Sequence, residues 1–358
     1  MDTILSSVKN AMARDGLDYI WVSSPENHRY VTGFNNPDGR VLVGHDDTFM
    51  LADFRYIEEG RRTAREGITA VCPEGRFISG FVADTLGGSE KLRIGYEQSR
   101  LTCSELDALK NAVPQAEFVP AGGIFDELRK TKKPYEAECI KKAQIITDGA
   151  FSHILNVLSS DMTELEVAAE LEYYMKKSGA EAISFETIAV SGKNSSSPHK
   201  TPENRKLEHG FLTMDFGAVI DGYHSDMTRT VVIGKADDEM RRLYDTVLTA
   251  QKAVLDVISV GKANFEMDKI ARDIIDGAGY KGAFGHSLGH GVGLEIHEEP
   301  NLSPRDNGQI LVPRNVVTVE PGIYLEGLYG CRIEDMVIIT EDGAEDITNS
   351  PKELIEIY

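Results

Sequence analysis

Two aspartates in the second half of the sequence lie in apolar, β-branched segments, where acidic side chains are uncommon. The segment FLTMDFGAVIDGYHSDMTRTVVI contains Asp215 and Asp226, and the dipeptide Asp221-Gly222 between two strand patterns predicts a two-residue type I′ turn. Counting outward from this turn places Asp226 opposite Gly217, so the two aspartates are diagonal neighbours on one face of the sheet. Like charges at roughly 7 Å in an apolar setting are destabilising unless a cation lies between them, which favours a metal ion.

A second pair of predicted strands repeats this arrangement. The segment NVVTVEPGIYLEG is followed by GCRIEDMVIIT, which places Glu320 and Glu334 on consecutive strands. The motif DFG of the first pair is similar to EPG of the second, and DMTRTVVI is similar to EDMVII. Two related hairpins therefore each contribute two carboxylates. Burying these four groups without compensation would be prohibitive, whereas two divalent ions would balance their charge. The pattern predicts a pseudo-twofold site for a pair of metal ions.

Histidines gather in the segment GAFGHSLGHGVGLEIHEEP, which contains His286, His290 and His297. The density of glycine argues against a helical zinc pair, and the segment fits neither HExxH nor GxGxxG. The clustering indicates chemistry, whereas His199, in the serine-rich NSSSPHKTPENR, is by itself consistent with a surface loop. The remaining histidines lack such a context and are interpreted as structural: His28, His45, His153, His209 and His224.

Composition excludes several classes of partner. The chain has 358 residues, 41% hydrophobic and 27% charged, as expected for a folded protein of two domains. Its formal net charge of −20 opposes binding to nucleic acid or to an anionic membrane surface. The four cysteines form no CxxC pair and are expected to be reduced thiols. Because neither a signal-peptide pattern nor an apolar run of about 18 residues occurs, we expect a cytoplasmic location.

The elements that must position these residues fall into two predicted domains. A helical pattern near 3–15, followed by the strand patterns DYIWV, VLVG and TFMLA, predicts an α/β domain over residues 1–128. The basic stretch LRKTKKP then precedes a helical pattern at 135–158. We therefore expect the second domain to cover residues 129–358.

Three further helices are predicted in the second domain. The capping box Thr163–Glu166 opens a helix that runs to about Gly179. The others are expected at 237–258 and at 264–277, the second with Asn264 as its N-cap. The strands that carry the unusual residues lie between and after these helices.

Together these residues resemble the pita-bread metallopeptidases, within them the Xaa-Pro aminopeptidase and prolidase branch. The family's ligands are an Asp, a second Asp about eleven residues on, a His in GHxxGHGxG, a Glu before Pro-Gly and a Glu in GxRxED. This chain matches each position, with Asp215, Asp226, His290, Glu320 and Glu334. SSPENHRYVTGF and ADFRY are similar to the N-terminal signature of the branch. Creatinase and the non-catalytic members lack this ligand set.

The resemblance implies an α/β (α+β) architecture. A small creatinase-like N-terminal domain would precede a pita-bread domain, in which helices flank a curved, pseudo-twofold antiparallel sheet. Asp226 and Glu334 would bridge two divalent ions, Asp215 would complete one ion, and His290 with Glu320 would complete the other. Mn²⁺ suits this oxygen-rich set with a single histidine, and Co²⁺ or Zn²⁺ is also compatible.

The resemblance also implies roles around the metals. His199 and His297 would contact the scissile carbonyl or the leaving group, and Glu320 would carry the proton. Arg332 would orient Asp215 through its bidentate fork. The implied catalytic residues are His199, His297, Glu320 and Arg332, and the implied substrate-binding residues are His286, His199 and Tyr324.

The main interpretation is therefore an Xaa-Pro aminopeptidase that acts on proline-containing peptides, and the resemblance implies a homodimer. The alternative is an Xaa-Pro dipeptidase (prolidase), which shares the ligand set. A different class, a non-catalytic binding protein stabilised by metal, would use closed sites, whereas five ligands for two ions leave positions open for water. The loop SGKNSSSPH is more serine-rich than the family pattern, which bears on substrate preference.

Overall fold

The computed structural model describes residues 4–73, 78–88 and 91–358. Contacts divide the chain into two compact units, Met1–Arg129 and Lys130–Tyr358, called here the N-terminal and C-terminal units. Among the described residues, no helix combines the length and the apolar character needed to cross a bilayer.

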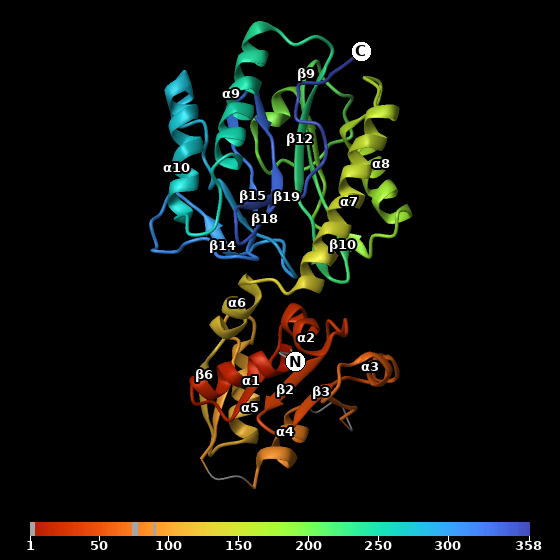
Figure 1. Ribbon diagram of the computed structural model, residues 1–358. Helices are drawn as coiled ribbons and strands as arrows, with labels where there is room; N and C mark the ends of the chain where they lie inside the picture. Colours follow the sequence, from red (N-terminus) through yellow and green to blue (C-terminus); the bar gives the residue numbers. More distant parts are fainter. Residues whose placement is uncertain (1–3, 74–77, 89–90) are drawn as a thin grey trace. The chain divides into compact units, whose positions relative to one another are not determined.

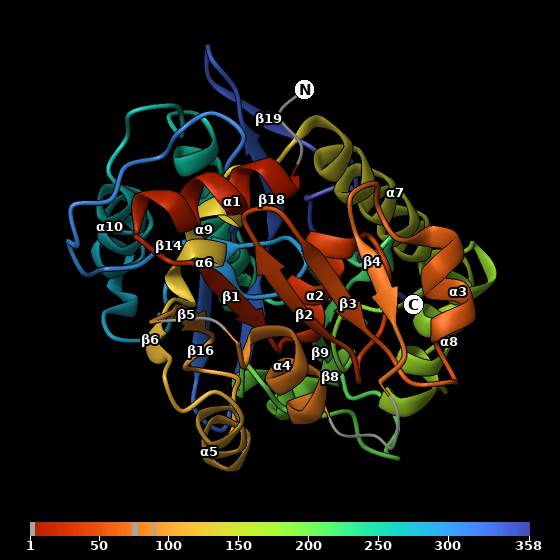
Figure 2. The same ribbon diagram turned by 90° about the horizontal axis from the view of Figure 1, so that it is seen from below.

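The N-terminal unit is built on a six-stranded mixed sheet of order β4-β3-β2-β1-β5-β6. Strands β1, β2 and β3 are antiparallel neighbours and lie side by side in Figure 2, whereas β4, β5 and β6 join in parallel. The strands are β1 (Tyr19–Val22), β2 (Arg40–Gly44), β3 (Thr48–Leu51), β4 (Thr69–Val71), β5 (Arg93–Tyr96) and β6 (Glu117–Pro120). The helices are α1 (Ile4–Arg14), α2 (Pro25–Thr32), α3 (Ile57–Thr63), α4 (Ile78–Leu86), α5 (Cys103–Ala112) and α6 (Gly123–Lys130).

The C-terminal unit contains two pairs of helices, one pair on each side of its strands (Figure 1). Helices α7 (Pro134–Val157) and α8 (Glu164–Lys177) pack on one sheet, and α9 (Asp238–Leu255) and α10 (Asn264–Ile275) pack on the other. Each sheet has its own apolar core, and the repetition of helix pair and sheet gives the pseudo-twofold architecture that the two related hairpins predicted. The fold class predicted from the sequence is confirmed.

The strands of the C-terminal unit form two main sheets and two smaller ones. The first main sheet contains β8 (Ile188–Ser191), β9 (Gly210–Phe216), β12 (Met227–Ile233) and β20 (Glu356–Ile357). The second contains β13 (Gly289–Gly291), β14 (Glu298–Leu302), β15 (Val316–Val319), β18 (Asp335–Ile339) and β19 (Ala344–Asp346). The smaller sheets contain β7 (Ala182–Ile183), β10 (Ala218–Ile220) and β11 (Tyr223–His224), and β16 (Gly322–Leu325) with β17 (Tyr329–Arg332).

The helix ends follow the sequence signals with one exception. Thr163 caps α8, and its hydroxyl and the Glu166 carboxylate form the predicted capping box. At α10 the N-cap is Ala263, and Asn264 is the first helical residue. The Asn264 amide instead donates to the carbonyl of Asn301 at 3.1 Å, so the prediction of an asparagine cap is wrong because a tertiary contact takes the side chain.

The first hairpin has the predicted turn and register. Asp221 and Gly222 both have positive φ, 49° and 79°, as a type I′ turn requires. The pairing continues without a slip into β9 and β12, where Asp215 faces Thr228, so Asp226 falls opposite Gly217. A Cβ atom on Gly217 would lie 1.9 Å from the Ser225 carbonyl oxygen, so only glycine fits at this position.

The second hairpin differs in register from the first. Val319 faces Asp335 and Gly322 faces Arg332, which places Glu320 opposite Glu334. In the first hairpin the glycine that corresponds to Gly322 is Gly217, and it lies opposite Asp226. The strand pairing of the two related hairpins therefore differs by two residues. The offset brings an arginine, in place of a second acid, to the position opposite Gly322.

Candidate active site

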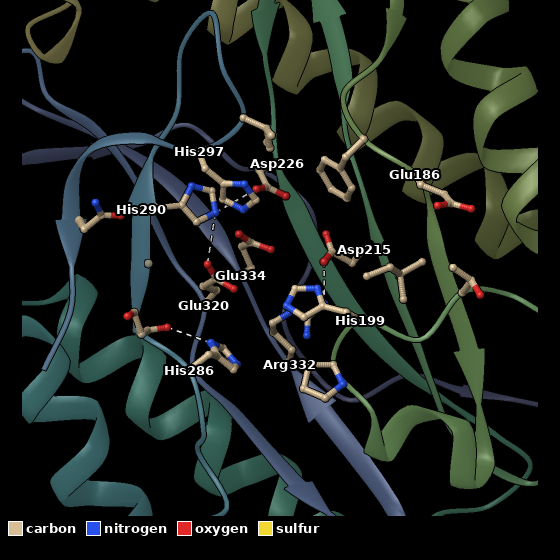
Figure 3. A pocket seen from close by; sticks show the side chains of 18 residues that line it. Glu186, His199, Asp215, Asp226, His286, His290, His297, Glu320, Arg332 and Glu334 are labelled. Atoms are coloured by element: carbon tan, nitrogen blue, oxygen red, sulfur yellow. Dashed lines mark hydrogen bonds and ion pairs between the residues drawn. The ribbon is translucent and has the colours of Figure 1, made fainter. Parts of the chain in front are cut away.

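A pocket of about 610 Å³ in the C-terminal unit is lined by the residues that the sequence predicts to bind metal. Its wall includes all five predicted metal ligands, and Figure 3 shows their side chains pointing toward one another. His199, His286, His297 and Arg332 also line it. The ligands are Asp215, Asp226, His290, Glu320 and Glu334.

Three of these residues form a compact donor group. Asp226, His290 and Glu334 each offer one ligand atom within 4.8 Å of the others. His290 Nε2 lies 3.5 Å from Asp226 Oδ2 and 3.4 Å from Glu320 Oε1. Because His290 Nδ1 lies 3.1 Å from the carbonyl oxygen of Gly291, which can only accept, Nδ1 carries the proton and Nε2 offers a lone pair to the pocket.

Arg332 is a protein cation beside these carboxylates, and it compensates their charge only in part. Burial, followed by the charge of Glu334, raises the pKa of Asp226 well above its usual range. Burial also raises the pKa of Glu320 to about 8 and that of Glu334 well above normal, and burial lowers the pKa of His290 to about 4. Acids that resist ionisation beside a neutral imidazole are expected where a bound cation normally balances the charge.

Unpartnered oxygen atoms support the same interpretation. Among the described residues, Asp215 Oδ1 and Glu334 Oε1 are buried without a hydrogen-bond partner. The second oxygen of each carboxylate is anchored, Asp215 Oδ2 by Arg332 at 2.6 Å and Glu334 Oε2 by the Thr228 hydroxyl at 2.6 Å. One fixed and one available oxygen on each carboxylate fit the needs of metal ligands.

Arg332 connects several parts of the site. Its Nη2 donates to Asp215, its Nη1 donates to the Tyr324 hydroxyl at 2.7 Å, and its Nε donates to the Thr228 hydroxyl at 2.9 Å. The guanidinium is therefore divided among three acceptors and does not form the bidentate pair with Asp215 that the sequence suggested. Thr228 lies two residues after Asp226 on the same strand face, a signal that strand alternation could have used.

Burial lowers the pKa of two further histidines beside the carboxylates, His286 and His297. His286 Nδ1 donates to the Ser287 carbonyl at 2.8 Å, so its Nε2 accepts from the Tyr324 hydroxyl at 3.0 Å, and burial lowers the pKa of His286 to about 3. The ring of His297 lies 4.3 Å from that of His290, centre to centre, and burial lowers the pKa of His297 as well. Tyr324 is not among the described residues that line the pocket, so it reaches the site through His286 and Arg332.

Two basic side chains that the sequence patterns did not identify contact the segment that carries His286, His290 and His297. Lys132 donates to Glu298 at 2.6 Å, directly after His297. Arg272 donates to the carbonyls of Phe284 and His286 at 2.7 and 2.9 Å. These partners lie far from the histidines in sequence, so no local pattern reports them.

Comparison with known proteins identifies the family. Residues 138–341, more than half of the chain, match metallopeptidase family M24, and residues 5–131 match the creatinase/prolidase N-terminal domain. An uncharacterized peptidase of Bacillus subtilis is 40% identical over 352 residues, covering 98% of this chain and 99% of its own. The Xaa-Pro dipeptidase of Pyrococcus furiosus is 35% identical over 354 residues, covering 98% of this chain and 99% of its own.

Solved structures agree with this assignment. The Xaa-Pro dipeptidase from Bacillus anthracis superposes with a TM-score of 0.93 at 40% identity, covering 99% of each chain. The X-Pro aminopeptidase from Thermotoga maritima has a TM-score of 0.89 at 33% identity, covering 97% of this chain and 100% of its own. The resemblance to the pita-bread metallopeptidases is confirmed, and the chain belongs to metallopeptidase family M24 as a metallo-exopeptidase.

Proposed function

We propose that this protein is an Xaa-Pro dipeptidase, which hydrolyses the bond before proline in dipeptides. The supporting observation is the end-to-end similarity to Xaa-Pro dipeptidases, including a structure at 40% identity and a TM-score of 0.93. The sequence pattern favours an aminopeptidase that acts on longer peptides, with the dipeptidase as the alternative. The relatives support that alternative better, although the similar Thermotoga maritima structure makes the aminopeptidase the second candidate.

The donor set fits two divalent cations. The ions would be held by Asp215, Asp226, His290, Glu320 and Glu334, which line one pocket. Such ions, when bound, supply Lewis acidity that polarises a peptide carbonyl and activates water. Four carboxylates with one imidazole suit Mn²⁺, and that choice is part of the proposal.

The chain's own residues would handle protons and orientation. The Glu320 carboxylate, whose Oε1 accepts from the Thr318 hydroxyl at 3.2 Å, would take the proton from the attacking water and deliver it to the proline nitrogen. His199 and His297 line the same pocket and would donate to the developing oxyanion or position the leaving nitrogen. Removing one such donor commonly costs about 10²- to 10³-fold in rate.

Substrate length provides the decisive test. The protein is stripped with chelator and reloaded with Mn²⁺, Co²⁺ or Zn²⁺, and release of the N-terminal residue is measured for Xaa-Pro and Xaa-Pro-Yaa. Cleavage of dipeptides alone supports the proposal, whereas cleavage of both lengths assigns an aminopeptidase. Metal binding without cleavage would favour a binding protein.

A histidine pair provides the matched control. His297→Ala should lower kcat by about 10²- to 10³-fold. His209→Ala removes an exposed histidine outside the pocket, whose Nε2 contacts the Lys235 carbonyl, and should leave activity unchanged. Retained activity in His297→Ala would remove this residue from the mechanism.

The homodimer and the cytoplasmic location remain predictions, and sedimentation analysis tests the homodimer.

A further inference from the structure

One buried carboxylate organises the segment that carries His199. This segment, residues 191–203, begins at the last residue of β8 and includes a 3₁₀ turn at Gly192–Ser196. Glu164, the first residue of α8, is fully buried and accepts from the Ser191 backbone N–H at 2.8 Å and from the Glu203 backbone N–H at 3.0 Å. The two ends of the segment therefore meet at one side chain.

The middle of the segment reaches the same carboxylate. The Asn194 amide nitrogen lies 3.2 and 3.1 Å from the two oxygens of Glu164. The Ser191 hydroxyl adds a further bond at 3.2 Å. Burying a carboxylate is costly unless donors surround it, and here all its partners come from residues 191–203. The carboxylate thus serves this segment.

The serines of the segment attach it to the hairpin β16–β17, which carries Tyr324 and Arg332. Ser195 Oγ accepts from the Gly330 backbone N–H at 2.9 Å, and Ser196 Oγ accepts from the Gly327 backbone N–H at 3.3 Å. A Cβ atom on Gly330 would lie 2.3 Å from the Ser195 carbonyl oxygen, so the two backbones are in direct contact. The serine-rich sequence before His199 has a structural explanation in these anchors.

His199 depends on this backbone for its placement. Its side chain is exposed at the pocket wall, and the described part of the chain gives its imidazole no hydrogen-bond partner. We propose that Glu164 is a positioning residue for His199. It acts through its hydrogen bonds to Ser191, Asn194 and Glu203, called here the clamp on residues 191–203. The proposal rests on the proposed function, because it assigns His199 a role in peptide hydrolysis.

A double-mutant cycle tests the coupling. Glu164→Gln keeps the shape but replaces one acceptor oxygen with a donor amide, which faces N–H groups. It should lower kcat by about 10- to 100-fold, because a small misplacement of a catalytic group can cost about 10²-fold. In the His199→Ala background the same change should alter kcat less than about twofold, because coupled sites are non-additive. Equal effects in both backgrounds, or loss of bound metal in Glu164→Gln, would overturn the proposal.

Two further variants separate positioning from general damage. Glu136→Gln alters a buried carboxylate of α7 that accepts from the Tyr223 hydroxyl at 2.6 Å and does not contact residues 191–203, so it should destabilise the fold without changing kcat. Asn194→Ala removes a single arm of the clamp and should lower kcat in the same direction as Glu164→Gln. If Glu164→Gln fails to fold, Asn194→Ala carries the cycle with His199→Ala.

A readout independent of activity completes the test. Histidine labelled with ¹³C at Cε1 gives a resonance for His199, assigned by its absence in His199→Ala. Glu164→Gln should shift or broaden this resonance, whereas Glu136→Gln should leave it unchanged. An unchanged His199 resonance in Glu164→Gln would overturn the positioning role. Wild-type protein that cleaves no Xaa-Pro peptide would instead reject the proposed function, and the resonance would still decide the positioning role.

Discussion

Nη2 of Arg332 donates to Oδ2 of Asp215 at 2.6 Å, and both side chains are buried in the wall of the pocket. The other guanidinium nitrogens are used by Tyr324 and Thr228, so the arginine fixes three groups at once. Asp215 Oδ1 is left without a partner among the described residues. The arrangement aims one oxygen of Asp215 while neutralising part of the local negative charge.

Arg332→Lys should therefore weaken metal binding and catalysis together. Lysine keeps the charge but loses the planar fork, so it cannot hold Asp215, Tyr324 and Thr228 at the same time. We expect a loss of about 10- to 100-fold in metal affinity or in kcat/KM, as for other partners of metal ligands. Metal titration and dipeptide kinetics measure the two quantities. Arg242→Lys, an exposed arginine on α9, provides the control, and wild-type values in Arg332→Lys would contradict this role.

Gly217→Ala should disrupt the first hairpin. The added Cβ atom would lie 1.9 Å from the Ser225 carbonyl oxygen, next to Asp226 in sequence, so the backbone must move. Overpacking of this kind typically costs about 1–3 kcal/mol, and displacement of Asp226 should also lower metal affinity. Denaturant unfolding and metal titration check both effects. Gly277→Ala, where nothing lies within 4 Å of the added Cβ, should change neither.

The ligand-bearing hairpins illustrate what the sequence could predict. The Asp221-Gly222 turn sets the register locally, so the placement of Asp226 opposite Gly217 follows from alternation alone. Arg332 and Asp215 are 117 residues apart, and their contact depends on how two hairpins pack. No local pattern reports such a contact, and for the same reason the clamp by Glu164 on residues 191–203 was not predicted.

The position of Asn264 shows the converse limit. Its residue type and place before a helical pattern predicted an N-cap, yet its amide donates to the Asn301 carbonyl at 3.1 Å. Local propensity was overridden because a tertiary partner was available. The sequence similarity of the two hairpins likewise predicted the structural repeat correctly. It did not predict that their registers differ by two residues, which changes the side chains that face each other.

Removal of metal should destabilise the C-terminal unit. Without cations, the buried carboxylates of Asp215, Asp226 and Glu334 and the half-buried carboxylate of Glu320 remain together, and their mutual repulsion opposes folding. A ligand at 100 times its Kd stabilises the native state by about 2.7 kcal/mol, so chelation should lower Tm by several degrees. Calorimetry with chelator and with added Mn²⁺ measures this. Asp226→Asn should abolish the response to Mn²⁺, and an unchanged Tm in the wild type would contradict metal binding at this site.

The N-terminal unit should lose stability as the pH falls from about 6.5 to 4. His28 is fully buried, its Nδ1 lies 3.2 Å from the Phe34 carbonyl oxygen, and burial lowers the pKa of His28 to about 4. Between pH 6.5, the ordinary pKa of histidine in the unfolded chain, and about pH 4, the unfolded chain binds a proton on His28 that the folded chain excludes. Lowering the pH therefore favours unfolding within this range, and His28 contributes no further loss of stability below about pH 4. The difference from an exposed histidine corresponds to about 3 kcal/mol.

Trp21 reports this effect separately from the active site. It is the single tryptophan of the chain, lies on β1 and is buried, so its fluorescence follows unfolding of the N-terminal unit. Denaturant midpoints of the wild type should fall from pH 7 to pH 4 more steeply than those of His28→Gln, which cannot titrate. His45→Gln, an exposed histidine in the same unit, should behave as the wild type. Parallel pH profiles for wild type and His28→Gln would show that His28 contributes nothing to acid sensitivity.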